Sequence, residues 1–197
     1  MRGAPLLDFA LHHLTLGRAA LYAAILERSA AVSAGPAAAT PDTKSASDSS
    51  NALFPAEAAA GGASPTPALL ALQDARRELD AAVSGLRHSG RSDILPASLL
   101  TRAWLRSLTG ARTGPESAQA DLDEAWEIAE RGPMRLFLAD IHLHRARLFF
   151  RENPYPWTSP QADLAAARKL IEQCGYWRRK QELEDAERTI LGVEPLV

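Results

Sequence analysis

A repeat of 42 to 43 residues is the feature that most constrains how this chain can fold. Glycines follow three helical segments at Gly90, Gly132 and Gly175, so the stops lie 42 and 43 residues apart. A fixed period of this length, with a helix pair in each unit, predicts a solenoid, because one pair cannot bury its apolar face alone. Inside the same segments the pattern Ala-x-x-x-Leu-x-x-Ala recurs at the same offsets, as Ala75/Leu79/Ala82, Ala118/Leu122/Ala125 and, more weakly, Pro160/Leu164/Ala167.

The composition agrees with a single helical domain. The chain has 197 residues, of which 46% are hydrophobic and 23% charged, enough for one sizeable core and too apolar for a wholly disordered protein. Alanine and leucine are abundant, and both favour helices. The net charge of -2 leaves no basic excess for a row of phosphates. We therefore expect an all-α fold that does not bind nucleic acid.

The sequence divides into four parts. Residues 1–31 are expected to form the first helix of the array. Residues 32–67 are rich in Ala, Ser, Pro and Gly and read as a disordered insert, because they have too little apolar surface to offset the entropy of ordering. Residues 68–191 hold the remaining helices, and 192–197 form a tail. About seven helices are predicted, over residues 6–31, 68–89, 94–109, 115–131, 133–151, 160–174 and 177–191.

Cysteine usage and the first helix bear on location. Cys174 is the single cysteine and cannot form an internal disulfide, which favours the cytoplasm. The first helix is apolar, but Asp8, Arg18 and Glu27 interrupt it, and a charge at the centre of a bilayer is costly. We therefore expect a soluble amphipathic helix and no membrane partner.

Small residues mark the first helix of each pair, at Gly17, Ala103 and Ala146, and Gly17 is in phase once the insert is removed. Together with the Ala/Leu/Ala pattern, they resemble the tetratricopeptide repeat (TPR) family. The period exceeds the usual length of about 34 residues, and a closing proline is present only at Pro133. The stretches 121–150 and 167–179 are similar to degenerate repeats at the C-terminal end of bacterial signalling NTPases. The resemblance implies a right-handed TPR-like solenoid of antiparallel helix pairs.

Motifs for catalysis are missing from the sequence. It contains no GxxxxGK[ST], GxGxxG, HExxH or GxSxG pattern, so we expect a protein that is not an enzyme and has no cofactor. Histidines stand adjacent or two apart, which points each pair in different directions on a helix and argues against metal binding. Asp140 and His144 share a helical face, and we interpret them as a structural pair rather than an acid and base.

Two clusters of charge are predicted to lie on solvated faces. The acidic side chains of residues 116–130 wrap around one helix and are expected to be partly paired with Arg131 and Arg135. In the last helix, i,i+4 pairs from Arg178 to Glu182 and from Lys180 to Glu184 would satisfy the basic cluster.

The resemblance also implies a concave groove lined by the first helix of each pair. Trp104 is the least settled residue there, because a core position would explain it as well. Trp, Tyr and Arg dominate interface hot spots, so we expect a non-catalytic scaffold or sensor module for signalling that binds a peptide or protein partner, preferably acidic. The alternatives are a small-molecule or nucleotide sensor pocket, and a structural unit that forms a homodimer through exposed end repeats. The predicted groove residues are Arg18, Tyr22, Trp104, Ser107, Asp140, Arg147 and Arg151.

Overall fold

The computed structural model describes residues 4–33 and 65–192, and this part of the chain is entirely helical. The predicted insert and tail fall almost wholly outside the described residues. The helices are α1 (Ala4–Ser33), α2 (Pro67–Ser89), α3 (Leu95–Leu108), α4 (Ala118–Arg131), α5 (Arg135–Phe149), α6 (Pro160–Cys174), the 3-10 turn η1 (Trp177–Arg179) and α7 (Lys180–Leu191).

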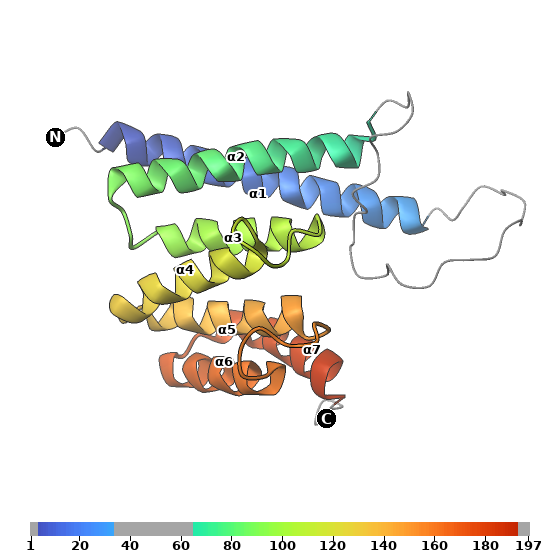
Figure 1. The fold of residues 1–197 in the computed structure, drawn as a ribbon, viewed down its shortest axis with the longest axis vertical. Helices are drawn as coiled ribbons and strands as arrows, with labels where there is room; N and C mark the ends of the chain where they lie inside the picture. Colours follow the sequence, from blue (N-terminus) through green and yellow to red (C-terminus); the bar gives the residue numbers. More distant parts are fainter. Residues whose placement is uncertain (1–3, 34–64, 193–197) are drawn as a thin grey trace, which may run out of the picture.

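The helices stack in chain order from α1 and α2 at one end to α6 and α7 at the other (Figure 1). Each helix contacts the next one, and α3 also contacts α1 and α5, while α5 contacts α7. Contacts between alternate helices are confined to the odd-numbered ones. The odd helices therefore form one layer, against which α2, α4 and α6 pack from the other side.

The residues of the repeated pattern are the core of this stack. Ala75, Leu79 and Ala82 are completely buried, as are their counterparts on α4. On α1, Gly17 lies so close to α2 that a β-carbon there would come within 2.8 Å of the Leu79 side chain. The small residue in the first helix of the pair is thus required by the close crossing of α1 and α2.

Two of the three repeated glycines close their helices as predicted. Gly90 and Gly175 have φ values of 68° and 62°, in the left-handed region that favours glycine, and they end α2 and α6. Gly132 also follows its helix, but its φ is -92°. A β-carbon at Gly132 would lie 2.7 Å from Cε of Met134. Close packing, rather than a left-handed turn, explains the glycine at that position.

Two predicted helix starts were wrong. Helix α4 begins three residues later than expected, because Ser117 caps it by accepting a hydrogen bond from the backbone N–H of Ala120, 3.1 Å away. Neither Gly114 nor the Thr113 and Glu116 pair is the cap. Helix α5 begins at Arg135 rather than at Pro133, which lies in the turn after α4.

The expectation of an amphipathic first helix was also wrong. One side of α1 is buried against α2 through Ala10, Leu14 and Leu21, but large apolar side chains such as Phe9 and Leu26 are exposed elsewhere on the helix. Among the described helices, the stretch Leu6–Ala30 is the one long and apolar enough to cross a membrane by length and composition. That property alone does not decide where the protein resides.

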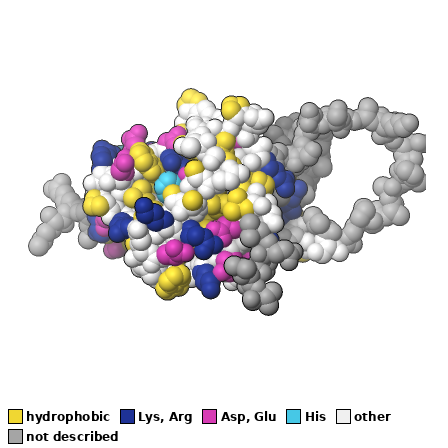
Figure 2. Space-filling model, turned by 90° about the horizontal axis from the view of Figure 1, so that it is seen from below, with side chains coloured by type: hydrophobic (Ala, Val, Ile, Leu, Met, Phe, Trp, Pro, Cys, Tyr) yellow, Lys and Arg dark blue, Asp and Glu magenta, His cyan; other side chains and the backbone are white. Residues whose placement is uncertain are grey.

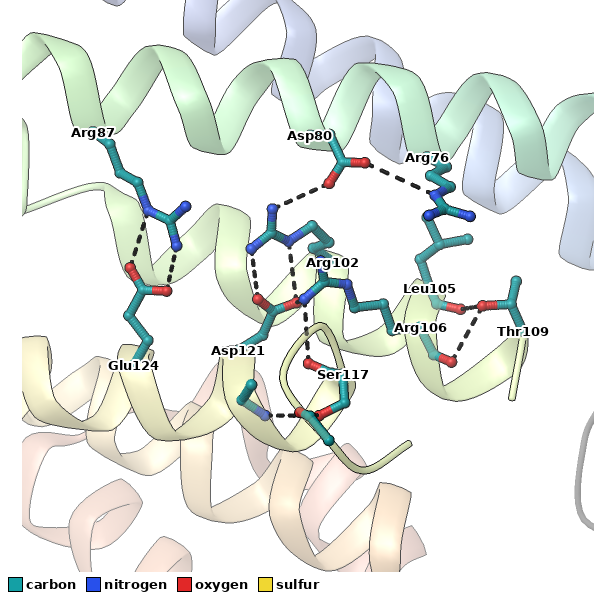
Figure 3. Close-up of polar contacts among 12 residues, drawn as sticks. Arg76, Asp80, Arg87, Arg102, Leu105, Arg106, Thr109, Ser117, Asp121 and Glu124 are labelled. Carbon is teal, nitrogen blue, oxygen red and sulfur yellow. Dashed lines mark hydrogen bonds and ion pairs between the residues drawn. The ribbon is translucent and has the colours of Figure 1, made fainter. Parts of the chain in front are cut away.

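The structure reveals a polar repeat that accompanies the apolar one. Arg102 on α3 donates to Asp80 on α2 and, through two nitrogens, to Asp121 on α4 (Figure 3). Forty-three residues later, Arg145 on α5 donates to Asp123 on α4. The carboxylates Asp80 and Asp123 are also 43 residues apart. An arginine therefore ties each of these two odd helices to the preceding even helix at the same point of the repeat.

A second repeated contact joins the two helices within a pair. His13 lies four residues before Gly17 and donates from Nδ1 to Glu78 on α2, 2.5 Å away. His142 lies four residues before Ala146 and donates to Asp163 on α6, 2.7 Å away. These equivalent pairs give both histidines a structural role that their spacing along the sequence did not reveal.

Candidate partner-binding groove

A cavity of about 700 Å³ lies across the layer of odd helices. Side chains of α1, α3 and α5 form its walls, and η1 with the start of α7 closes it at the C-terminal end. The lining residues are Arg18, Leu21, Tyr22, Ala97, Leu100, Thr101, Trp104, Phe137, Asp140, His144, Arg147, Leu148, Arg178, Arg179 and Glu182.

Five of the seven residues assigned to the groove from the sequence line this cavity, namely Arg18, Tyr22, Trp104, Asp140 and Arg147. Ser107 is buried beside the cavity, where its hydroxyl donates to the carbonyl oxygen of Trp104 at 2.8 Å. Arg151 lies beyond the end of α5 and places its guanidinium over the Phe150 ring. Neither Ser107 nor Arg151 lines the cavity, so their assignment to the groove is corrected here.

The N-terminal end of the groove is aromatic. The ring of Tyr22, from α1, meets the ring of Trp104, from α3, edge to face with centroids 5.6 Å apart. Tyr22 is exposed, whereas Trp104 is half-buried and also packs on the core formed by α1, α2 and α3. Trp104 thus serves both the groove and the core, which the sequence treated as alternatives.

Arg18 is the cation of the groove that has the weakest compensation. Its Nε donates to the Thr101 hydroxyl at 3.2 Å and its Nη2 to the carbonyl oxygen of Ala97 at 3.3 Å, and no ion pair to a carboxylate is seen for it within the described part of the chain. Burial lowers the pKa of Arg18, Tyr22 partly opposes the shift, and the charge of Arg179 lowers the pKa further. Two guanidiniums therefore repel each other across the groove.

The C-terminal end of the groove is a network of ion pairs. Arg179 donates from Nε to Asp140 at 2.7 Å and from Nη1 to Glu182 at 2.6 Å. Arg147 shares the same Glu182 at 3.2 Å. Burial works against the charge of Arg179, but the hydrogen bond from Asp140 outweighs it and raises the pKa of that arginine. The network fixes η1 and α7 against α5.

His144 lies half-buried at the floor of this network. Its Nδ1 donates to the backbone carbonyl of Asp140 at 2.7 Å, while the Asp140 carboxylate accepts from Arg179 and from the hydroxyl of Tyr176. Burial lowers the pKa of His144, and Arg147 and Arg179 lower it further, although the bond to the Asp140 carbonyl opposes them. The predicted shared face of Asp140 and His144 exists, but its side chains do not form an acid and base pair.

The sequence interpretation missed the contribution of the last segment to the groove. It expected Arg178 to pair with Glu182, whereas Arg178 donates to the Tyr176 hydroxyl at 2.7 Å and Glu182 is taken by Arg147 and Arg179. Continuing the repeat into this segment as a further first helix would have brought these side chains to the groove. The predicted pair from Lys180 to Glu184 is present, at 3.7 Å.

The predicted solvated acidic face of α4 was wrong in one respect. Asp121 is only 2% exposed, and both Arg102 and Arg106 pair with its carboxylate. Glu124 pairs with Arg87 of α2 rather than with a residue on its own helix. The acidic side chains of α4 thus join it to its neighbours. They do not form a cleft with a second set of carboxylates.

No metal-binding cluster of three or more His, Cys, Asp or Glu side chains occurs in residues 4–33 and 65–192. The chain matches no protein-family model, no curated protein and no solved structure. The nature of the groove therefore rests on its own side chains.

Proposed function

We propose that this chain is a non-catalytic, TPR-like helical-repeat module that binds an acidic peptide or protein segment in the groove across its odd helices. The observation that carries the proposal is the charge of the lining. Four arginines, Arg18, Arg147, Arg178 and Arg179, face two carboxylates there. An anionic side chain entering the groove would relieve the repulsion between Arg18 and Arg179, which a cationic one would increase.

The shape of the groove also favours an extended segment over a deeply enclosed ligand. Its lining comes from three successive odd helices and from η1, and neighbouring packed helices lie about 8–10 Å apart. The Tyr22 and Trp104 rings at one end and the arginines at the other would hold an apolar residue and an acidic residue of the same segment. Such a pair of anchors is typical of peptide recognition.

A small anionic molecule with an aromatic ring is the second candidate. The cavity volume of about 700 Å³ lies within the range of about 300–1,000 Å³ found for small-molecule sites. The aromatic and cationic ends of the groove would suit a nucleotide as well as a peptide. A peptide differs in that its affinity should grow with length until the whole groove is covered.

The test is fluorescence anisotropy with labelled peptides of about ten residues. One has alternating acidic and aromatic residues, and the others replace its acidic residues with Lys or with Gln. We expect the acidic peptide to bind best and to weaken as salt is raised. Arg147→Glu should reduce its affinity by about 1–2 kcal/mol. The fold should tolerate this change, since the ion pair of Arg147 with Glu182 is exposed.

Arg131→Glu is the matched control. Arg131 is an exposed arginine at the end of α4, away from the groove, and donates to the backbone carbonyl of Glu127. Equal loss of binding in the two variants would mean that only overall charge matters. Equal affinity for the acidic and Lys peptides would refute the proposal. Binding of ATP that displaces no peptide would favour the small-molecule alternative.

A further inference from the structure

The exposed side of α1 carries a stripe with the spacing of a helix-packing seam. Its residues recur at alternating intervals of three and four, and every one of them is exposed. This spacing places them in one line along the helix, as in the a and d positions of a coiled coil. The stripe consists of Phe9, His12, Leu16, Ala19, Ala23 and Leu26.

The stripe is separate from the contacts that α1 makes within the molecule. Ala10, Leu14 and Leu21 face α2 from almost the opposite side of the helix. Arg18 and Tyr22 point into the groove on another side. Phe9, Leu16 and Leu26 are 62%, 42% and 68% exposed, and the stripe contains no Asp, Glu, Lys or Arg. A helix that docks here would therefore leave the groove open.

The order of large and small residues makes the stripe complementary to itself. If a second α1 runs antiparallel about a twofold axis between residues 17 and 18, Phe9 meets Leu26 of the other copy. Leu16 then meets Ala19, and each larger side chain lies against a smaller or more flexible one. Asp8 and Glu27 flank opposite sides of the stripe, so the axis does not bring these like charges together.

The opposite end of the stack does not offer an equally apolar surface. Figure 2 views the molecule from the end that carries α6 and α7, where basic and acidic side chains lie between hydrophobic areas. On α7 the exposed residues include Lys180, Glu184, Asp185 and Arg188. A head-to-tail stack would bury these charges against the apolar stripe, whereas a symmetric contact between two α1 helices would not.

We propose that two copies of this chain associate through an antiparallel pairing of their α1 stripes. From Phe9 to Leu26 the seam is about 26 Å long, and with the width of one helix it covers about 300 Å² per partner. A standard stable interface covers about 800 Å² per partner. The pairing is thus a weak, reversible dimer, with dissociation in the micromolar range or above.

Sedimentation velocity of the full chain over about 1–500 µM tests this prediction. We expect the average mass to rise from that of a monomer toward that of a dimer and no further. Leu16→Glu should weaken the association at least about tenfold, because it buries charge at the centre of the seam. Leu136→Glu, at an equally exposed leucine of α5, is the control and should leave the association unchanged. Circular dichroism should show that both variants keep their helices.

Disulfide cross-linking tests the register. In a Cys174→Ser background, the Phe9→Cys and Leu26→Cys proteins are oxidised separately and as a mixture. The antiparallel pairing brings the two positions together across the dimer, while each is about 26 Å from its own copy. Cross-linking should therefore occur only in the mixture. Cross-linking of each variant alone, assembly beyond a dimer, or a monomer at all concentrations would overturn the proposal. A monomer that binds neutral vesicles, with loss of binding in Leu16→Glu, would assign the stripe to a lipid surface instead.

Discussion

Removal of the Arg102 guanidinium should be among the most damaging single changes in this protein. Arg102 joins three helices, through bonds of 3.1 Å to Asp80 and of 2.6 and 3.1 Å to the two oxygens of Asp121 (Figure 3). The side chains of Arg102 and Asp121 are 10% and 2% exposed. Loss of one partner from a buried pair leaves an uncompensated charge, which typically costs about 3–5 kcal/mol.

The expected value for Arg102→Met lies near the lower limit of that range, at about 3 kcal/mol. Asp121 keeps one ion pair, because Arg106 approaches its second oxygen to 3.0 Å. Methionine also fills much of the space of the arginine stem. Replacing both partners, as Arg102→Met with Asp121→Leu, should restore most of the lost stability, because no charge is then left buried without a partner.

Urea unfolding followed by far-UV circular dichroism provides the measurement, with the midpoint and slope fitted together. Arg87→Met is the matched control, since Arg87 makes a two-nitrogen contact with Glu124 but both side chains are substantially exposed. That change should cost less than about 1 kcal/mol. If Arg102→Met costs no more than Arg87→Met, or if the double variant is less stable than Arg102→Met alone, the reasoning about burial is refuted.

Three further predictions concern packing, pH and a loop. Gly17→Ala should destabilise the protein by about 1 kcal/mol in urea unfolding, since the clash with Leu79 exceeds the gain in helix propensity; a more stable variant would disprove the close approach. Below the ordinary pKa of 6.5, the unfolded chain protonates before His144 does in the fold, so the unfolding free energy should fall as pH falls, and His144→Gln should flatten that slope; an unchanged slope would contradict this. Trp157→Phe should cost about 1–3 kcal/mol in the same unfolding assay through loss of the 2.8 Å bond from the indole to Asp123; a neutral effect would show that this bond does not hold the loop after α5.

The apolar half of the fold follows directly from the sequence. A leucine flanked by alanines at fixed spacing can be buried in only one way on a helix, so the pattern around Leu79 and Leu122 predicted both the helices and their core faces. The Gly17 position could be recognised because close helix crossing excludes a β-carbon. Helix ends were harder, because Ser117 and Gly114 both supply chemically acceptable starts and only the path of the preceding loop selects between them.

The polar half was predicted less well because its partners are distant in the sequence. Asp121 looked like one of many surface acids until α3 placed Arg102 and Arg106 against it. Spacing within one helix predicted the pair of Lys180 with Glu184, but it failed for Arg178, whose tertiary partner is the Tyr176 hydroxyl. Local i,i+4 pairs are weak, and a buried or shared partner on another helix readily outcompetes them.

The arrangement of these charges explains how a chain with a net charge of -2 can have a cationic groove. Asp80, Asp121 and Asp123 point from the even helices toward Arg102 and Arg145, and they neutralise these arginines between the layers. The carboxylates used there do not reach the far side of the odd layer, where the groove lies. Net charge therefore gives no guide to the sign of the field in the groove. If an acidic segment binds there, the salt dependence of its affinity reports on the few arginines that line the groove, because the buried pairs are screened far less by salt.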